Sequence, residues 1–146
     1  MAENNHMTET SADNKHPHQL ITPVRVRYVE CDPMNVAHHS AYLPWLEIAR
    51  SEMLRRGGMS YAECEKAGVF FVVARVSVRY RKPAYYDDVL DIEVKRESAS
   101  RFSLDHVYRV VRDQELVAEA ATTLVCVDSD GKPQPIPQWL LGEGGS

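Results

Sequence analysis

Residues 40–58, SAYLPWLEIARSEMLRRGG, predict the element on which the whole fold depends. Apolar side chains recur there at helical spacing and form one stripe, made of Tyr42, Trp45, Leu46, Ala49 and Met53 and widened by Leu43 and Leu54. Ser40 is the expected N-cap, Pro44 is close enough to the start to be tolerated, and Gly57-Gly58 is the expected stop. We therefore expect an amphipathic helix of about four turns, whose stripe another element must cover.

Beyond this helix, apolar and polar residues alternate, which predicts strands. Strands are expected at 24–29, 69–81, 90–95, 102–110 and 116–127, and the second of them is expected to bury Val72, Ala74, Val76, Val78 and Tyr80. Connections of hairpin length separate the last four strands, so we expect these to run antiparallel in sequence order. Ser60-x-x-Glu63 resembles a capping box and predicts a short helix that ends near Gly68.

The apolar face of such a sheet must be buried, and the striped helix is the candidate to cover it. The predicted fold class is therefore α+β, with an antiparallel sheet wrapped around one long central helix, which is the hotdog fold. A length of 146 residues suits one domain. We expect a disordered N-terminal tail over 1–20, the folded domain over 21–132 and an extended C-terminal tail over 133–146.

Composition argues against several classes of partner. The net charge of −4 and the pI near 5.8 give no global attraction for nucleic acid. The longest apolar stretch, residues 69–74, is far shorter than the roughly 20 residues of a membrane helix, so no transmembrane segment is expected. Cys31, Cys64 and Cys126 form no C-x-x-C pair, and the N-terminus lacks the pattern of a signal peptide. These features favour reduced thiols and a cytoplasmic protein.

Two blocks of sequence carry a resemblance to a known family. Residues 28–50, YVECDPMNVAHHSAYLPWLEIAR, contain an acid, a His, a Tyr and a Glu-x-x-Arg pair; residues 79–90, RYRKPAYYDDVL, contain a strand end, a Pro-Ala turn and a strand restart. Together they resemble the 4-hydroxybenzoyl-CoA thioesterase-like family, a hotdog group that includes the Tol-Pal-associated acyl-CoA thioesterases. The resemblance covers roughly residues 24–128. It implies an acyl-CoA thioesterase that needs no cofactor, because coenzyme A is part of its substrate.

The resemblance also implies roles for individual residues. In the family, the acid that aligns with Asp32 either attacks the thioester carbonyl or acts as general base for water, and an ionised carboxylate suits both roles. His39 is implied as an orienting catalytic group and Tyr42 as a substrate-binding residue. Backbone N–H groups at the helix start, near His39, are expected to stabilise the oxyanion. The alternatives are that Asp32 is only a turn residue before Pro33, or that Glu47 is the acid.

A basic run, Arg75, Arg79, Arg81 and Lys82, lies on one strand and its end. Charge on a sheet face commonly serves solvation alone. Because coenzyme A carries phosphates, Arg79, Arg81 and Lys82 are also candidates for substrate binding by charge-assisted hydrogen bonds. His38 and His39 have no acid or Cys cluster at zinc-like spacing, so no metal site is expected. His106 is expected to be a satisfied core histidine.

Two other functions stay open. A hotdog hydratase or dehydratase acting on acyl-CoA or acyl-carrier-protein would need an Asp-x-Asn-Pro-x-His pattern, whereas Asn35 and His38 fall one residue too far from Asp32 and no Pro separates them. A non-catalytic acyl-CoA-binding protein would keep the fold without the chemistry. The resemblance also implies a homo-oligomer, a dimer or tetramer with its active site across the seam. Many family members have Gly after the acid, and Asn35 is expected to supply the left-handed geometry instead.

Overall fold

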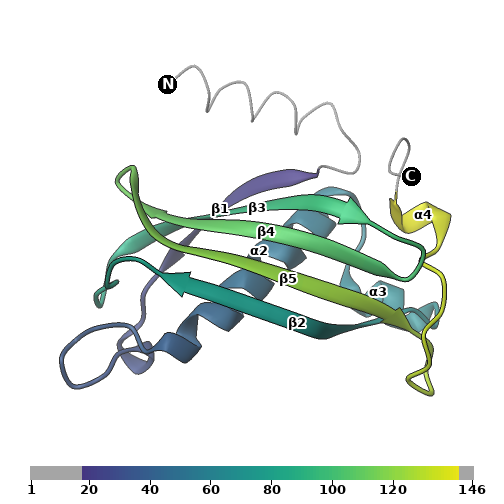
Figure 1. Cartoon of the computed structure of the whole chain (residues 1–146), viewed down its shortest axis with the longest axis horizontal. Helices are drawn as coiled ribbons and strands as arrows, with labels where there is room; N and C mark the ends of the chain where they lie inside the picture. Colours follow the sequence, from purple (N-terminus) through teal and green to yellow (C-terminus); the bar gives the residue numbers. More distant parts are fainter. Residues whose placement is uncertain (1–17, 142–146) are drawn as a thin grey trace.

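The computed structural model describes residues 18–141 and contains five strands and three helices within that range (Figure 1). Its elements, in chain order, are β1 (Gln19–Arg25), α2 (Tyr42–Arg56), α3 (Tyr61–Lys66), β2 (Phe70–Tyr80), β3 (Val89–Ala99), β4 (Ser103–Arg112), β5 (Glu115–Val127) and α4 (Gln138–Leu141). Two single 3-10 turns, Tyr28–Glu30 and His39–Ala41, lie between β1 and α2. The expectation of a disordered tail falls outside the described residues for 1–17, and β1 already begins at Gln19, within the predicted tail.

The strands form one antiparallel sheet in the order β1-β3-β4-β5-β2. The two hairpins β3-β4 and β4-β5 confirm the predicted pairing of these strands. The prediction that β2 pairs with β3 was wrong, because β1 occupies the free edge of β3 and β2 pairs with β5 instead. The first strand was also predicted too late in the chain: it ends at Arg25, and residues 28–30 form a 3-10 turn.

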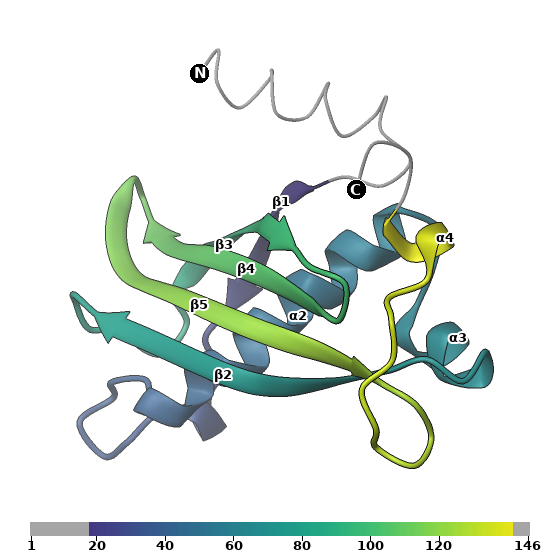
Figure 2. The same cartoon turned by 45° about the vertical axis from the view of Figure 1, so that its right-hand side comes forward.

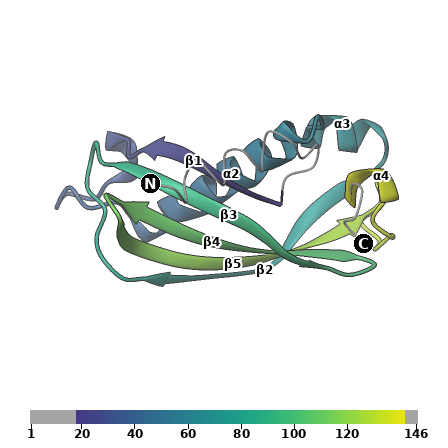
Figure 3. The ribbon, with the colours of Figure 1, turned by 90° about the horizontal axis from the view of Figure 1, so that it is seen from above.

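Helix α2 lies across one face of the sheet and gives the molecule the predicted hotdog architecture (Figure 3). Its buried residues include the whole predicted stripe, which packs with Leu90, Ile92 and Val94 of β3 and Tyr108 and Val110 of β4. Leu43 is 44% exposed, so it does not widen the stripe as expected. The prediction that Ser40 caps α2 was wrong, because the 3-10 turn His39–Ala41 precedes the helix. The side chain of His38 caps this turn by accepting a hydrogen bond from the N–H of Ser40. The Ser60–Glu63 capping box is confirmed.

Strand β2 is more exposed than its alternating pattern predicted. Val72, Val76 and Tyr80 are 47%, 40% and 47% exposed, and α2 makes most of its sheet contacts with β1 and β3 rather than with β2. A register shift between Val73 and Arg75 also places Ala74 in a bulge and breaks the alternation. Strand β2 is therefore an open edge of the sheet, and a groove lies between it and α2.

The C-terminal segment closes the opposite end of the molecule from the start of α2 (Figure 2). Helix α4 and the residues before it bury Ile136 and Leu140 in a second core with Cys64, Leu104 and Cys126. The prediction of an extended tail from residue 133 was therefore wrong for 136–141, because two apolar residues there cover the end of the sheet. No helix among residues 18–141 is long and apolar enough to cross a membrane.

Candidate functional site

The loop that carries Asp32 folds back on itself before α2 begins. Cys31 and Ala37 form an isolated antiparallel β-bridge, and the N–H of His38 donates to the carbonyl of Glu30 at 2.7 Å. Asn35 has a φ of 70°, which confirms the left-handed geometry expected of it. The loop is tied to the β2–β3 connection, since the N–H of Ala37 donates to the carbonyl of Ala84 at 2.7 Å. Asp32 is thereby held beside the segment that leads into the helix.

The carboxylate of Asp32 has one engaged oxygen and one free oxygen. Its Oδ1 accepts hydrogen bonds from the N–H of Met34 at 2.9 Å and from the N–H of Val36 at 3.1 Å. Its Oδ2 takes part in no hydrogen bond within residues 18–141. Asp32 is thus a turn residue, as its position before Pro33 suggests, and in addition presents a carboxylate oxygen that can accept a proton or attack a carbonyl carbon.

The entrance of α2 offers one uncommitted amide. The N–H of Ser40 donates to Nδ1 of His38 at 3.3 Å, and the N–H of Ala41 donates to the carbonyl of His38 at 2.9 Å. The N–H of His39 has no hydrogen-bond acceptor among residues 18–141. A free amide at a helix start is the type of donor that stabilises a developing oxyanion.

Two tyrosines fix the position of His39. The hydroxyl of Tyr80 donates to the carbonyl oxygen of His39 at 2.9 Å, and its ring packs edge-on against Tyr42 with 5.0 Å between centroids. Burial, with the nearby Tyr80 adding to it, raises the pKa of Tyr42 to about 12, so its hydroxyl stays protonated. Tyr80 was predicted only as a buried strand residue; its contact with the helix entrance has no signal in the sequence pattern.

A surface hollow brings together four of the six predicted site residues. It is lined by Val36, Ala37, His39, Tyr42, Tyr80, Arg81, Lys82 and Pro83. Asp32 belongs to the loop that supplies Val36 and Ala37 but does not itself line the hollow. Arg79 lines a neighbouring hollow with Ser77 and with Glu119, the residue that also pairs with Arg81. Arg79 therefore does not line the hollow that contains Arg81 and Lys82.

The two basic residues of the hollow already have carboxylate partners. Arg81 pairs with Glu119 at 3.3 Å, and Lys82 pairs with Glu115 at 2.9 Å. These pairs are exposed to solvent, and such pairs contribute only about 0–1 kcal/mol. A phosphate group can therefore displace the carboxylates at little cost.

Glu30 supports this end of the molecule and was missed by the sequence analysis. Its side chain is largely buried and accepts hydrogen bonds from the N–H of Arg27 at 2.8 Å and from Nε1 of Trp45 at 3.0 Å. It thus ties the Asp32 loop to α2. No pattern in the sequence signals this role, because Arg27-x-x-Glu30 lacks the Ser or Thr that begins a capping box.

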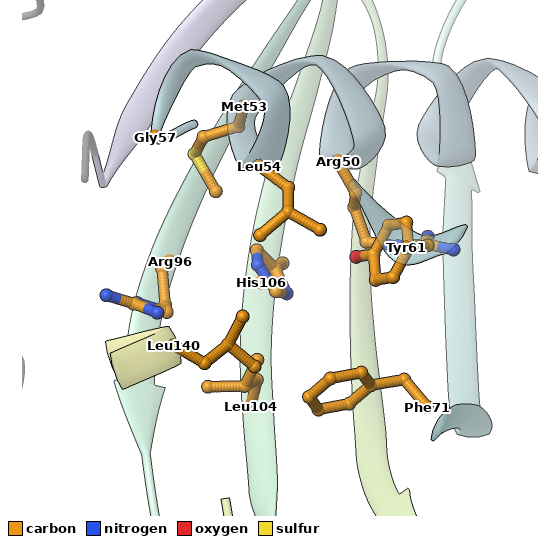
Figure 4. A pocket seen from close by; sticks show the side chains of 10 residues that line it. All are labelled: Arg50, Met53, Leu54, Gly57, Tyr61, Phe71, Arg96, Leu104, His106 and Leu140. Atoms are coloured by element: carbon orange, nitrogen blue, oxygen red, sulfur yellow. The ribbon is translucent and has the colours of Figure 1, made fainter. Parts of the chain in front are cut away.

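The other end of α2 carries a buried polar cluster around Arg50 (Figure 4). Arg50 is 8% exposed, and its Nη1 donates to the hydroxyl of Tyr108 at 3.3 Å, while no ion pair within residues 18–141 joins it to Glu47. Glu47 is exposed beside the open groove. His106 is buried as predicted, but its Nδ1 has no hydrogen-bond partner in the described chain, so the expectation of a satisfied histidine was wrong.

Comparison with known proteins identifies the family of this chain. A sequence model of the thioesterase-like superfamily matches residues 26–143. The chain belongs to this superfamily. Membership confirms the family and the thioesterase class that residues 28–50 and 79–90 predicted.

Relatives of this thioesterase-like chain cover most of its length. An acyl-CoA thioester hydrolase, YbgC, of Escherichia coli is 37% identical over 123 residues, which are 83% of this chain and 92% of that protein. The crystal structure of a hypothetical protein from Aquifex aeolicus has a TM-score of 0.81 at 34% identity and covers 84% of this chain and 96% of its own. A DHNA-CoA thioesterase from Staphylococcus aureus has a TM-score of 0.77 at 32% identity, with 80% of each chain covered. These likenesses confirm the hotdog fold.

No group of three or more His, Cys, Asp or Glu residues that could hold a metal ion occurs in the part of the chain that the structure describes.

Proposed function

We propose that this chain hydrolyses acyl-CoA thioesters to the free acid and coenzyme A. The supporting observation is the Asp32 loop, which leaves one carboxylate oxygen free and leads directly to the uncommitted amide of His39. The relatives named as acyl-CoA thioester hydrolases and thioesterases support the same substrate class. Reduced cysteines and the bacterial relatives favour action in the cytoplasm.

The chemistry follows from these two groups. In the general-base route, Asp32 takes a proton from water, the water oxygen attacks the thioester carbon, and the oxyanion accepts a hydrogen bond from the N–H of His39. The C–S bond then breaks, and the departing thiolate takes the proton back. In the nucleophilic route, Oδ2 attacks the carbon, the thiolate leaves, and water hydrolyses the resulting anhydride. Either route needs the ionised carboxylate.

A thiol-release assay with a panel of aliphatic and aromatic acyl-CoAs tests the proposal directly. We expect steady release of coenzyme A from at least one of them. A hydratase or dehydratase would change the acyl group without releasing thiol, and a binding protein would do neither. Absence of thiol release from the whole panel rejects the thioesterase.

Arg81 and Lys82 are proposed to bind the phosphates of coenzyme A, because both line the hollow that contains His39 and Tyr42. We expect the double variant Arg81→Ala/Lys82→Ala to raise KM for acyl-CoA about tenfold while kcat changes little. Arg79→Ala removes a basic residue of the same strand that lies outside the hollow, and we expect a smaller effect from it. An unchanged KM in the double variant would assign both residues to surface charge alone.

We propose that the functional unit is a homo-oligomer, a dimer or a tetramer. Strand β2 is an open sheet edge, and its exposed Val73 and Val76 line a groove together with the exposed Leu43 of α2. Light scattering at micromolar concentration should give at least twice the mass of one chain. A monomer would contradict both the assembly and a site shared between two chains.

A further inference from the structure

A small cavity lies between the C-terminal half of α2 and the sheet, at the far end from Asp32. Its volume is about 40 Å³, and its polar lining consists of Arg50, Tyr61, Arg96 and His106. A water molecule needs about 10–15 Å³ on this measure, so the cavity accommodates about three or four waters or one small anion. Figure 4 shows the hydroxyl of Tyr61 on the side of its ring that faces His106, with the guanidinium of Arg50 behind the same ring, Leu54 above and Leu104 below.

Two buried polar atoms of this cavity have no partner within the described chain: Nε of Arg50 and Nδ1 of His106. The two residues are 8% and 4% exposed. An arginine is almost never buried this deeply without a counter-ion, because desolvation of its charge costs several kcal/mol. Arg50 interacts with two tyrosine hydroxyls, those of Tyr108 and Tyr61, and the hydroxyl of Tyr108 also lies 2.7 Å from that of Thr122. Burial raises the pKa of both tyrosines, so neither supplies a counter-ion.

Within residues 18–141 the side chains that line the cavity include two cations and no carboxylate. Burial, with the charges of Arg50 and Arg96 adding to it, lowers the pKa of His106 to about 3, so the ring is neutral near pH 7. Arg96 donates to the carbonyl oxygen of Leu141 at 3.2 Å, and its Nη2 lies 2.7 Å from Nε2 of His18. Asp105, the neighbour of His106 in β4, is engaged on the opposite face with Thr123 and Ser98.

We propose that this cavity is a binding site for a carboxylate group, which accepts hydrogen bonds from Nε of Arg50 and from the hydroxyl of Tyr61. The neutral ring of His106 contributes a further polar contact. A carboxylate fits because it is small, planar and anionic, and because a guanidinium donates to it in the same plane.

The carboxylate can come from two sources. One is a free small acid; the other is the far end of the substrate's acyl group, a possibility that rests on the proposed thioesterase function. A groove along α2, lined by Leu43, Leu46, Val73 and Val76, shares Arg50 with the cavity and offers an apolar surface on which an acyl chain could lie. Eight residues separate Tyr42 from Arg50, which at the helical rise is about 12 Å, the span of a medium-length acyl chain.

The binding site is tested first with formate alone. Wild-type protein labelled with ¹⁵N at histidine is titrated with sodium formate at constant ionic strength. We expect a saturable shift of the His106 ring nitrogens and none for His38 or His39. Tyr61→Phe should weaken formate binding about tenfold, as expected for loss of one hydrogen bond to a charged group. Because Arg50→Gln removes a buried charge and its folding is at risk, the wild-type titration and Tyr61→Phe carry this test.

Glu47 and Glu65 are carboxylates of the described chain that line a neighbouring hollow with Arg50 and Tyr61, although neither forms an ion pair with Arg50 within residues 18–141. Glu47→Gln and Glu65→Gln are therefore the matched controls, and each should leave formate affinity unchanged. The proposal is overturned if wild type shows no saturable shift, or if the shift occurs only in Glu47→Gln or only in Glu65→Gln, because that glutamate would then be the occupant.

The source of the carboxylate is tested with pairs of acyl-CoAs of equal length that end in a carboxylate or in a methyl group. If the acyl group is the source, the ratio of their kcat/KM values should peak at one chain length, and Tyr61→Phe should lower that peak about tenfold. A flat ratio together with formate binding assigns the site to a free acid. If no acyl-CoA is hydrolysed, the proposed thioesterase fails, while the formate titration still decides the cavity.

Discussion

Asp32→Asn should reduce the turnover of acyl-CoA by roughly 100-fold or more, the effect typical of losing a general base. The side-chain oxygen of Asn can still accept hydrogen bonds from the N–H groups of Met34 and Val36, so the loop should keep its shape. The charge on the free oxygen is lost. We expect KM to change little, because the amide of His39 and the hollow remain. Steady-state thiol release measures both constants.

Asp32→Ala is the matched control for this prediction. It removes the charge and also the acceptor for the two loop amides, so it should lower stability by about 1 kcal/mol in addition to the loss of turnover. Asp32→Asn should unfold at nearly the wild-type urea concentration. Near wild-type turnover in Asp32→Asn would leave Asp32 as a turn residue only, and Glu47 would become the acid to test.

Trp45→Ala should lower the free energy of unfolding by about 3–5 kcal/mol, a large part of the roughly 5–15 kcal/mol that holds a typical domain together. Trp45 is 1% exposed, its ring lies 4.7 Å from that of Tyr42, and its Nε1 donates to Glu30. Removal leaves a cavity under the helix entrance and frees Glu30 from α2. Urea unfolding followed by circular dichroism measures the loss.

Trp45→Phe separates the ring from its N–H group. Oε2 of Glu30 keeps its contact with Arg27 at 3.1 Å, so no buried charge is orphaned, and we expect a loss below about 2 kcal/mol. Equal losses in the two variants would show that the hydrogen bond to Glu30, not the packing of the ring, dominates. A loss below about 1 kcal/mol in Trp45→Ala would contradict the packing argument.

Local patterns predicted the elements, and long-range pairing limited the rest. The stripe of α2 and the alternation in β3 and β4 are properties of neighbouring residues, and burial follows them. The position of β2 beside β5 depends on β1 taking the edge of β3, a pairing of residues about seventy positions apart. The length of a connection does not show whether β1 or β2 pairs with β3, so the order of the strands in the sheet was not predicted.

The candidate site was predictable where its residues lie in one segment. Asp32, Asn35 and His39 belong to a single loop, and their resemblance to a family identified them together. Tyr80 and Glu30 reach the site through tertiary contacts, which no spacing in the sequence displays. The unsatisfied Nδ1 of His106 was also invisible, because its neighbours Arg50 and Arg96 come from α2 and β3.

Helix α4 makes one end of the molecule independent of the other. The first core, around Trp45, Ile92 and Tyr108, contains no residue beyond Ala120. The second core depends on Ile136 and Leu140, and Leu140 also lines the cavity next to His106. Local unfolding of α4 would therefore widen the opening of the cavity to water while the sheet and α2 stay packed around the first core.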